Sequence, residues 1–437
     1  MLTYLINVTG DMLALSLIIG IMLAFMDSFC KGKGKLIYRI GIGVGLIAAG
    51  VRAYITNTRR LVGGWKVGAY GYGIALGLFV LTAIILAVFS HWFLKRKEGK
   101  KIGTVAEILI SSFAGLLTAA ELFCAMPNVY AYPFKFDTGG NGILSTDFLF
   151  RLGGYLLGLL LCGVSCSCAR RLLTAAAKKG YSRLLYIDFC AGNVLWCVNL
   201  FAMLMLVLTP RKVIDSPELF DFAAASNNYS YWYTFGVFIL LVITAVIFII
   251  GSHTKKEPYS TNAQHRKQRA VWRSGKRSSV VLAVCFVLGI LCATWFVELN
   301  TVVIREAPIE DPVIEKNASG KDASLVVPIE AVEDGHLHRF GYKTEDGNLV
   351  RFIVVLKQEN TTNYGVGLDA CEICGEAGYY ENNNGQIVCK KCNVIMNRTT
   401  IGMKGGCNPI IIDYDIDENA ITVPVEEMIK NQSHFKS

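Results

Sequence analysis

The chain has 437 residues, of which 53% are apolar and 18% are charged, and its mean hydropathy is +0.42. This composition excludes an ordinary water-soluble protein, which contains fewer apolar residues. The net charge of +9 combines a basic part, residues 1–298 with 30 Lys and Arg against 13 Asp and Glu, and an acidic part, residues 299–437 with 13 against 21. The basic side chains lie in short loops between apolar stretches, so we expect no nucleic-acid partner.

Apolar stretches of about twenty residues, each long enough to cross a bilayer, recur up to Leu299. They predict a polytopic α-helical membrane bundle of about eight transmembrane helices within residues 1–298, embedded in membrane lipid. No basic segment precedes the first stretch, so we expect Met1–Thr9 to be a short tail and not part of a cleaved signal peptide. The expected spans are 10–29, 38–56, 68–93, 103–126, 147–168, 185–209, 233–252 and 279–298.

Lys and Arg concentrate in alternate loops between these spans. Four loops contain 22 of them, and the three loops that alternate with these contain 6. Cytoplasmic loops of membrane proteins are the basic ones, so we expect a multi-pass protein of the cytoplasmic membrane with both termini on the extracytoplasmic side. The basic loops are 30–39, 94–102, 170–184 and 253–278, and the others are 56–66, 127–147 and 210–233.

Four charged residues lie in or near the expected spans: Arg52, Glu121, Arg151 and Asp188. Ionised groups are costly inside a bilayer and usually face a cavity or a partner, so these residues are candidates for an ion, quinone or electron path through the bundle. The alternative is structural, because a side chain near a helix end can reach the interface or pair with another charge. The structural alternative is favoured for the two arginines, whereas the position of Glu121 within LLTAAELFCAM fits either.

Beyond the bundle, residues 299–324 are charged and contain proline, as is typical of a linker. We expect a small, mostly β, metal-binding domain over residues 325–437. HLHRFGYK and LVRFIVVLK flank the turn-forming TEDGN and predict one hairpin, and YYE and QIVC flank NNNG and predict a second. NPIIIDYDI and AITVPV predict further strands, and VEEMIK predicts a short helix. A core this small gains stability from a metal ion or a disulfide.

The strongest chemical signal is a pair of Cys-x-x-Cys motifs, Cys371/Cys374 and Cys389/Cys392, separated by fourteen residues. Each motif can place two sulfurs on one ion, so the two together suit tetrahedral thiolate ligation. Gly375 suits the tight backbone after the first motif. The pattern indicates a metal without indicating which metal.

A fifth thiol and two histidines extend this pattern. Cys407 follows Gly405 and Gly406 and can replace a ligand, cap an exposed cluster iron or act as a redox partner. His336 and His338 project from the same face of a strand, and paired imidazoles suit copper, iron, zinc or haem. The alternative is that both histidines are partly exposed surface residues.

Two other uses of the cysteines remain open at this point. The domain faces an oxidising compartment, where structural disulfides form, and Cys-x-x-Cys pairs also act as redox dithiols. A pair this short in sequence is more typical of a metal site or a dithiol than of a structural disulfide.

The stretches DGHLHRFGYKTEDGNLVRFIVVLK, LDACEICGEAGYYENNNGQIVCKKC and GGCNPIII resemble the bacterial membrane iron–sulfur proteins called FtrD-like. The resemblance covers roughly Glu330–Val423. It implies an iron–sulfur or other metal centre at the cysteines of the two motifs and at Cys407, with the two histidines nearby. It also implies a role in iron uptake, with an iron permease or an extracytoplasmic iron-binding protein as the partner.

The resemblance therefore implies a redox component that transfers electrons for iron uptake, and not a classical enzyme. The expected cofactor is an iron–sulfur cluster or a mononuclear iron, with zinc as the alternative. Two other functions stay open: a zinc- or other metal-binding module that serves a permease, and a transmembrane thiol–disulfide oxidoreductase. No catalytic triad, phosphate loop or nucleotide fingerprint is present in the sequence.

Overall fold

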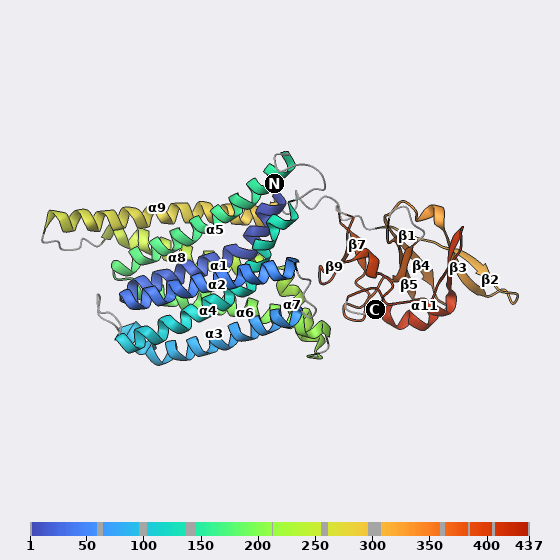
Figure 1. The fold of residues 1–437 in the computed structure, drawn as a ribbon, viewed down its shortest axis with the longest axis horizontal. Helices are drawn as coiled ribbons and strands as arrows, with labels where there is room; N and C mark the ends of the chain where they lie inside the picture. The colour runs from blue at the N-terminus through green and yellow to red at the C-terminus, as the bar shows by residue number, and fades with distance from the viewer. Residues whose placement is uncertain are drawn as a thin grey trace. The chain divides into compact units, whose positions relative to one another are not determined.

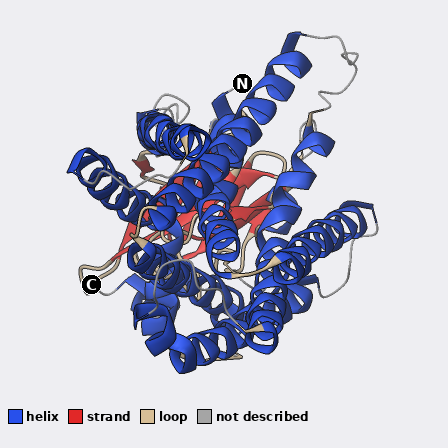
Figure 2. Ribbon diagram, turned by 90° about the vertical axis from the view of Figure 1, so that its left-hand side faces the viewer, coloured by secondary structure: helices blue, strands red, loops and turns tan. Residues whose placement is uncertain are grey.

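The computed structural model forms two compact units, one of Met1–Val207 with Tyr229–Asn300 and one of Leu208–Asn228 with Thr301–Ser437. The first unit is a helical bundle, and strands occur only in the second (Figures 1 and 2) among the residues that the structure describes. Those residues are 2–58, 64–95, 103–136, 146–211, 213–254, 261–295, 307–358, 363–382, 385–403 and 407–435.

Within the described chain, eight helices are long and apolar enough to cross a membrane. This confirms the predicted number of spans and fits a multi-pass membrane protein. The eight helices of the bundle are α1 (Leu2–Phe29), α2 (Gly32–Thr58), α3 (Gly64–Lys95), α4 (Thr104–Ala131), α5 (Thr146–Lys178), α6 (Ser182–Leu208), α8 (Tyr231–Thr254) and α9 (Asn262–Ala293).

Helices α1 and α9 begin much earlier than the sequence predicted. Helix α1 starts at Leu2, so the expectation that Met1–Thr9 is a tail was wrong for the described residues. Helix α9 starts at Asn262, well before the predicted span at 279, and the Thr261 side chain caps it by accepting a hydrogen bond from the Gln264 N–H. The first half of α9 is basic, so hydropathy alone could not detect it.

The interior of the bundle is built around α1. This helix is apolar on all sides and buried along most of its length, as expected for a core helix and not for one at the surface. Helix α1 packs along α5, and α2 packs along α4. Helix α2 turns a stripe of exposed apolar side chains outward, which in a membrane protein is the face toward lipid; the stripe is Leu36, Ile40, Val44, Ile47 and Val51.

Two glycines allow α2 to approach α4 closely. A Cβ atom added at Gly41 would lie 2.6 Å from the Gly115 carbonyl oxygen, and one added at Gly45 would lie 2.7 Å from the Ala119 Cα. Small residues at such spacing let helix backbones approach closely in membranes. By contrast, a Cβ at Gly43 would meet nothing within 4 Å.

The second unit contains three small sheets with strand orders β1-β4-β5-β6, β10-β11-β3-β2 and β7-β8-β9. It also contains helices α7 (Pro217–Asn228) and α11 (Val425–Asn431). The strands are β1 (Ile309–Glu310), β2 (Val313–Lys316), β3 (Asp322–Pro328), β4 (Leu337–Lys343), β5 (Leu349–Leu356), β6 (Tyr364–Leu368), β7 (Tyr379–Glu381), β8 (Ile387–Cys389), β9 (Ile395–Met396), β10 (Asp415–Ile416) and β11 (Ala420–Pro424).

The predicted hairpins correspond to β4–β5 and β7–β8, and the short helix predicted at VEEMIK is α11. The segment predicted as a linker, 299–324, already contains β1, β2 and the start of β3. Strand β2 is exposed and lies at the edge of its sheet, where charged residues are common. Its composition therefore resembled a linker. Residues 299–306 of the predicted linker lie outside the described residues.

The core of the β unit forms between the β4–β5–β6 sheet and the β3–β11 pair. Phe340 faces Phe352 across the hairpin, and the two rings stack with centroids 5.4 Å apart. Strand β6 is buried along its whole length, and its last residue, Leu368, pairs with Phe352. The packed core therefore fixes the point where the chain leaves β6 and enters the first cysteine motif.

The close approach of α2 and α4 predicts a large difference between two neighbouring glycines. We expect Gly41→Leu to destabilise the bundle by at least the cost of overpacking, about 1–3 kcal/mol, because the new side chain meets backbone atoms that cannot move aside. Gly43→Leu has free space and should leave stability within about 0.5 kcal/mol. Thermal unfolding of both variants in detergent, followed by circular dichroism, checks this. Equal unfolding temperatures would contradict the close contact.

Candidate metal centre

The first cysteine motif forms a tight backbone loop directly after β6. The N–H of Gly375 donates to the Cys371 carbonyl (3.0 Å) and the N–H of Cys371 donates to the Gly375 carbonyl (3.1 Å). The backbone N–H of Cys374 donates to the Cys371 sulfur at 3.0 Å. Gly375 has a φ of 65°, a left-handed conformation that glycine adopts without strain. This confirms the sequence argument for Gly375.

The second motif repeats this loop at the end of β8. The N–H of Asn393 donates to the Cys389 carbonyl at 3.0 Å, as the N–H of Gly375 does in the first motif. Asn393 has a φ of 54° and is the non-glycine residue with positive φ in the described chain. Asparagine tolerates this conformation better than most residues. Both motifs therefore have the same knuckle, with a left-handed residue directly after the second cysteine.

The hairpin β7–β8 brings the two knuckles together. Tyr379 pairs with Cys389, so the strand that follows the first knuckle holds the start of the second. Two overlapping groups of three sulfurs result, each with all three atoms within 4.8 Å of one another. The groups are Cys371, Cys374 and Cys407, and Cys374, Cys389 and Cys392.

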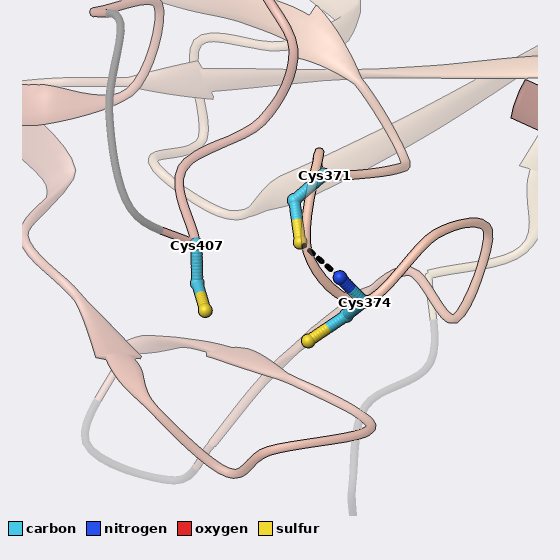
Figure 3. Close-up of side chains that lie close together, drawn as sticks. All are labelled: Cys371, Cys374 and Cys407. Atoms are coloured by element: carbon cyan, nitrogen blue, oxygen red, sulfur yellow. Dashed lines mark hydrogen bonds between the residues drawn. The ribbon is translucent and has the colours of Figure 1, made fainter. Parts of the chain in front are cut away.

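Cys407 joins this cluster from a separate segment. Its sulfur lies 3.6 Å from that of Cys392, and Figure 3 shows its side chain converging with those of Cys371 and Cys374. The hydroxyl of Tyr379 donates to the Cys407 carbonyl at 2.6 Å and so holds this segment against the hairpin. Cys407 is half-buried, whereas the other four cysteines are buried. The glycines expected to help its approach, Gly405 and Gly406, lie outside the described residues.

The thiols of the cluster interact strongly. Hydrogen bonds from the neighbouring thiols, that of Cys374 above all, lower the pKa of Cys371 and Cys392. The interaction with Cys371 in turn raises the pKa of Cys374. Thiolates are the form of cysteine that binds metals.

The sulfur spacing tests whether these residues fit a metal. A tetrahedral ion with metal–sulfur bonds of about 2.3 Å separates its sulfurs by about 3.8 Å. The 3.6 Å between the Cys392 and Cys407 sulfurs is close to this spacing, and the sulfurs of each group of three lie within 4.8 Å of one another. The five sulfurs can therefore supply a complete thiolate ligand set, and the N–H groups aimed at them can stabilise its negative charge.

A buried ion-pair network beneath the cluster fixes the first knuckle to the hairpin. Asp369, two residues before Cys371, lies 2.9 Å from the Arg339 Nε and 3.2 Å from the Arg351 Nε. The same carboxylate accepts a hydrogen bond from the Tyr379 N–H at 2.8 Å. Asp369 is 1% exposed, and burial raises the pKa of its carboxyl while the two arginines and the N–H oppose the shift. A Cβ at Gly378 would lie 2.8 Å from this carboxylate, so the chain needs glycine there.

The structure places the two predicted histidines beside carboxylates. The Nδ1 of His336 lies 3.2 Å from the Glu381 Oε1, and the Nε2 of His338 lies 2.8 Å from the Asp334 Oδ1. The Nδ1 of His338 faces Glu310 at 3.4 Å. Among the described residues, neither histidine belongs to a group of three or more possible ligands. Their role as metal ligands stays a prediction, and their contacts agree with the surface alternative.

The four charged residues predicted for the membrane are dispersed in the bundle. Arg52 donates to the Phe123 carbonyl at 2.8 Å and stacks on the ring of Phe123, in agreement with a packing role. Asp188 is buried and accepts a hydrogen bond from the Thr244 hydroxyl at 2.7 Å. Glu121 is 1% exposed, and its Oε2 has no hydrogen-bond partner in the described part of the chain.

Arg151 is half-buried in α5. A path through the bundle that uses these four residues stays a prediction.

Sequence reasoning missed one element that contacts the second knuckle. Helix α7 belongs to the β unit, and its Asp221 forms an ion pair with Lys391 at 2.7 Å. Asn228, the last residue of α7, donates to the Lys391 carbonyl and accepts from the Asn393 side chain, both at 2.9 Å. A signal was present, because Ser216-Pro217-Glu218 is a typical helix start.

Comparison with known proteins shows that part of the β unit is similar to a protein family. Residues 332–435 match the family model described as "Membrane iron-sulfur containing protein FtrD-like". The match contains all five cysteines of the cluster and both histidines. Searches of curated proteins and of solved structures found no match.

The network around Asp369 predicts local loosening when the carboxylate is removed. In Asp369→Ala, Arg339 stays buried without its counter-charge, and loss of one partner of a buried pair costs about 3–5 kcal/mol. We expect hydrogen–deuterium exchange in the full-length protein to increase over residues 369–392 and to stay unchanged in the bundle. Asp346→Ala, at an exposed position, is the control. Wild-type protection in Asp369→Ala would show that the knuckle does not depend on this carboxylate.

Proposed function

We propose that the β unit binds a single iron ion through thiolates and acts as a one-electron carrier in bacterial iron uptake. The observation that carries this proposal is the convergence of five sulfurs, in groups that each fit within 4.8 Å. When bound, iron in such a site supplies reversible one-electron redox chemistry. The match of residues 332–435 to a membrane iron–sulfur family supports iron over zinc.

The sulfur spacing supports a single ion over a [4Fe–4S] cluster. In a [4Fe–4S] cluster each of the four cysteines binds a different iron atom, which spreads their sulfurs apart. Each group of three sulfurs lies within 4.8 Å, which is compact enough for thiolates that share one ion. A site that binds one ion also needs no assembled cluster on the extracytoplasmic side.

We assign the four ligand positions to Cys371, Cys374, Cys389 and Cys392. All four are buried, and the two knuckles orient their sulfurs through backbone geometry. Cys407 is half-buried and enters from outside the knuckles. In this proposal Cys407 adjoins the ligand set next to Cys392, shields that side of the ion and contributes negative charge that tunes the potential.

The cellular setting is part of the same proposal. The distribution of Lys and Arg supports a cytoplasmic membrane location with both termini extracytoplasmic. The β unit would then meet iron, or an iron-binding protein, outside the membrane, and an iron permease is the expected partner.

Metal analysis of the purified full-length protein tests this function. We expect about one iron per chain, visible absorption from thiolate-to-iron charge transfer that bleaches on one-electron reduction, and no acid-labile sulfide. Stoichiometric zinc without colour would replace the proposal with a metal-binding module. Labile sulfide would replace the single ion with a cluster. Absence of metal together with reversible disulfides would identify a thiol–disulfide oxidoreductase.

Cysteine variants separate the roles within the cluster. Cys374→Ser removes a sulfur that belongs to both groups of three, and we expect it to lose stoichiometric iron. Cys407→Ser should keep iron, with affinity lowered by about 10–100-fold, as for other residues adjoining a ligand set. Titration of each variant with Fe²⁺ under anaerobic conditions measures both effects. Equal losses in the two variants would make Cys407 a ligand, and Cys285→Ser, in the bundle, is the control.

The proposed orientation makes a separate prediction. A cysteine introduced at the C-terminus by Ser437→Cys should react with a membrane-impermeant maleimide in intact cells, and one introduced by Ser274→Cys, within the basic segment of α9, should not. The background is a variant whose native cysteines are blocked or replaced. The reverse labelling pattern would place the β unit in the cytoplasm and remove the extracytoplasmic role.

A further inference from the structure

A cavity of about 220 Å³ lies between α3, α4 and α6 in the bundle. Its lining is mostly apolar and includes Phe79, Leu117 and Phe189, with Thr82 and Asn193 among the few polar residues. A cavity of about 150 Å³ engineered in another protein binds benzene. The space here is therefore sufficient for one substituted six-membered ring.

The cavity adjoins the lipid-facing surface of the bundle. Three of its lining residues, Ala83, Ala87 and Val194, are exposed on α3 and α6. Exposed apolar side chains of membrane-spanning helices face the lipid. A ligand dissolved in the bilayer can therefore reach this cavity without crossing water.

Two polar groups at the cavity can accept a hydrogen bond from a ligand, whereas the Tyr186 hydroxyl, which also lines the cavity, donates to the Leu86 carbonyl at 3.4 Å. The amide nitrogen of Asn193 donates to the Phe189 carbonyl at 2.7 Å, but its Oδ1 has no hydrogen-bond partner among the described residues. Asn193 is 6% exposed. The Thr82 hydroxyl donates to the Leu78 carbonyl at 2.7 Å, so its oxygen can still accept. A buried acceptor without a donor is costly inside a membrane, so the fitting ligand donates hydrogen bonds.

We propose that this cavity binds the ring of a lipid-soluble quinol, with one ring hydroxyl donating to the Asn193 Oδ1. The proposal rests on the proposed electron-transfer function and names the chemical class of its electron donor. A phospholipid chain fits the apolar lining but carries no donor. The quinone form keeps the ring and loses both hydroxyl donors, so the site should prefer the quinol.

The electrons and protons released by quinol oxidation are both accounted for. Oxidation of one quinol to the quinone releases two electrons and two protons. Two oxidised iron centres of the kind proposed above would each accept one electron, and the protons would pass to water. Binding of the quinol needs no electron transfer and can be measured without it.

Calorimetric titration of the full-length protein in detergent, with decylubiquinol and with decylubiquinone, tests the proposal under anaerobic conditions. We expect the wild type to bind the quinol about tenfold more tightly than the quinone. Asn193→Leu should weaken quinol binding by about 3- to 10-fold and leave quinone binding nearly unchanged, because one hydrogen bond is lost. Asn199→Leu is the matched control: Asn199 is on the same helix and also has a buried Oδ1 without a partner in the described chain, but it is not among the lining residues.

A second pair of variants covers the case in which Asn193→Leu fails to fold. Ala83→Phe fills the cavity from an exposed position and should abolish binding of both forms, whereas Val80→Phe, also exposed but away from the cavity, should not. Equal affinity of the wild type for quinol and quinone, or equal effects of the two asparagine variants, would overturn the proposal.

The titration is repeated with Cys374→Ser, which is expected to lack metal. Normal quinol binding by this variant would show that the two sites bind independently. Iron analysis of the wild type tests the proposed iron site, and the titration tests quinol binding. Either proposal can therefore fail while the other holds.

Discussion

The arrangement of the cysteine cluster depends on one buried carboxylate. Asp369 joins β6 to the first knuckle, faces two arginines and accepts the Tyr379 N–H that starts the β7–β8 hairpin. Because that hairpin carries Cys389, the same carboxylate fixes the distance between the two knuckles. Arg339 also donates to the Tyr379 carbonyl, so both backbone groups of this tyrosine are held. A charge that is excluded from water must stay paired, so arrangements that separate Asp369 from the arginines are unfavourable. The two knuckles, and with them the cysteine sulfurs, are therefore held in one arrangement.

The local geometry of each knuckle could be predicted from the sequence, and the convergence of all five thiols could not. Cys-x-x-Cys followed by glycine indicates a tight loop, and Gly375 has the expected positive φ. The second knuckle uses Asn393, a weaker signal for the same conformation. Cys407 reaches the cluster through the Tyr379 hydroxyl and a separate chain segment. Such contacts depend on tertiary packing, which spacing along the chain does not encode.

In the whole fold, too, some elements could be predicted from the sequence and others could not. Hydropathy predicted eight spans because the bilayer requires long apolar helices, and alternation of residue type predicted the β4–β5 hairpin. Sequence patterns did not detect elements whose residues are polar, exposed or part of a connecting segment. The basic half of α9 is helical without being apolar, β2 is a strand although its residues are exposed, and α7 is a short helix within a connecting segment. Each of these depends on neighbours that a single sequence does not show.

The two units differ in whether their buried polar side chains have hydrogen-bond or ion-pair partners, and this difference bears on the role of the bundle. In the β unit, Asp369 and Glu381 each face at least one arginine. In the bundle, the Oε2 of Glu121 and the Oδ1 atoms of Asn193 and Asn199 lack partners within the described residues. Water can satisfy such atoms at a domain surface, but the hydrocarbon of a bilayer cannot. A helical anchor needs no such residues, and leucine in their places would pack without this cost. Their presence therefore agrees with the proposal that the bundle binds a ligand.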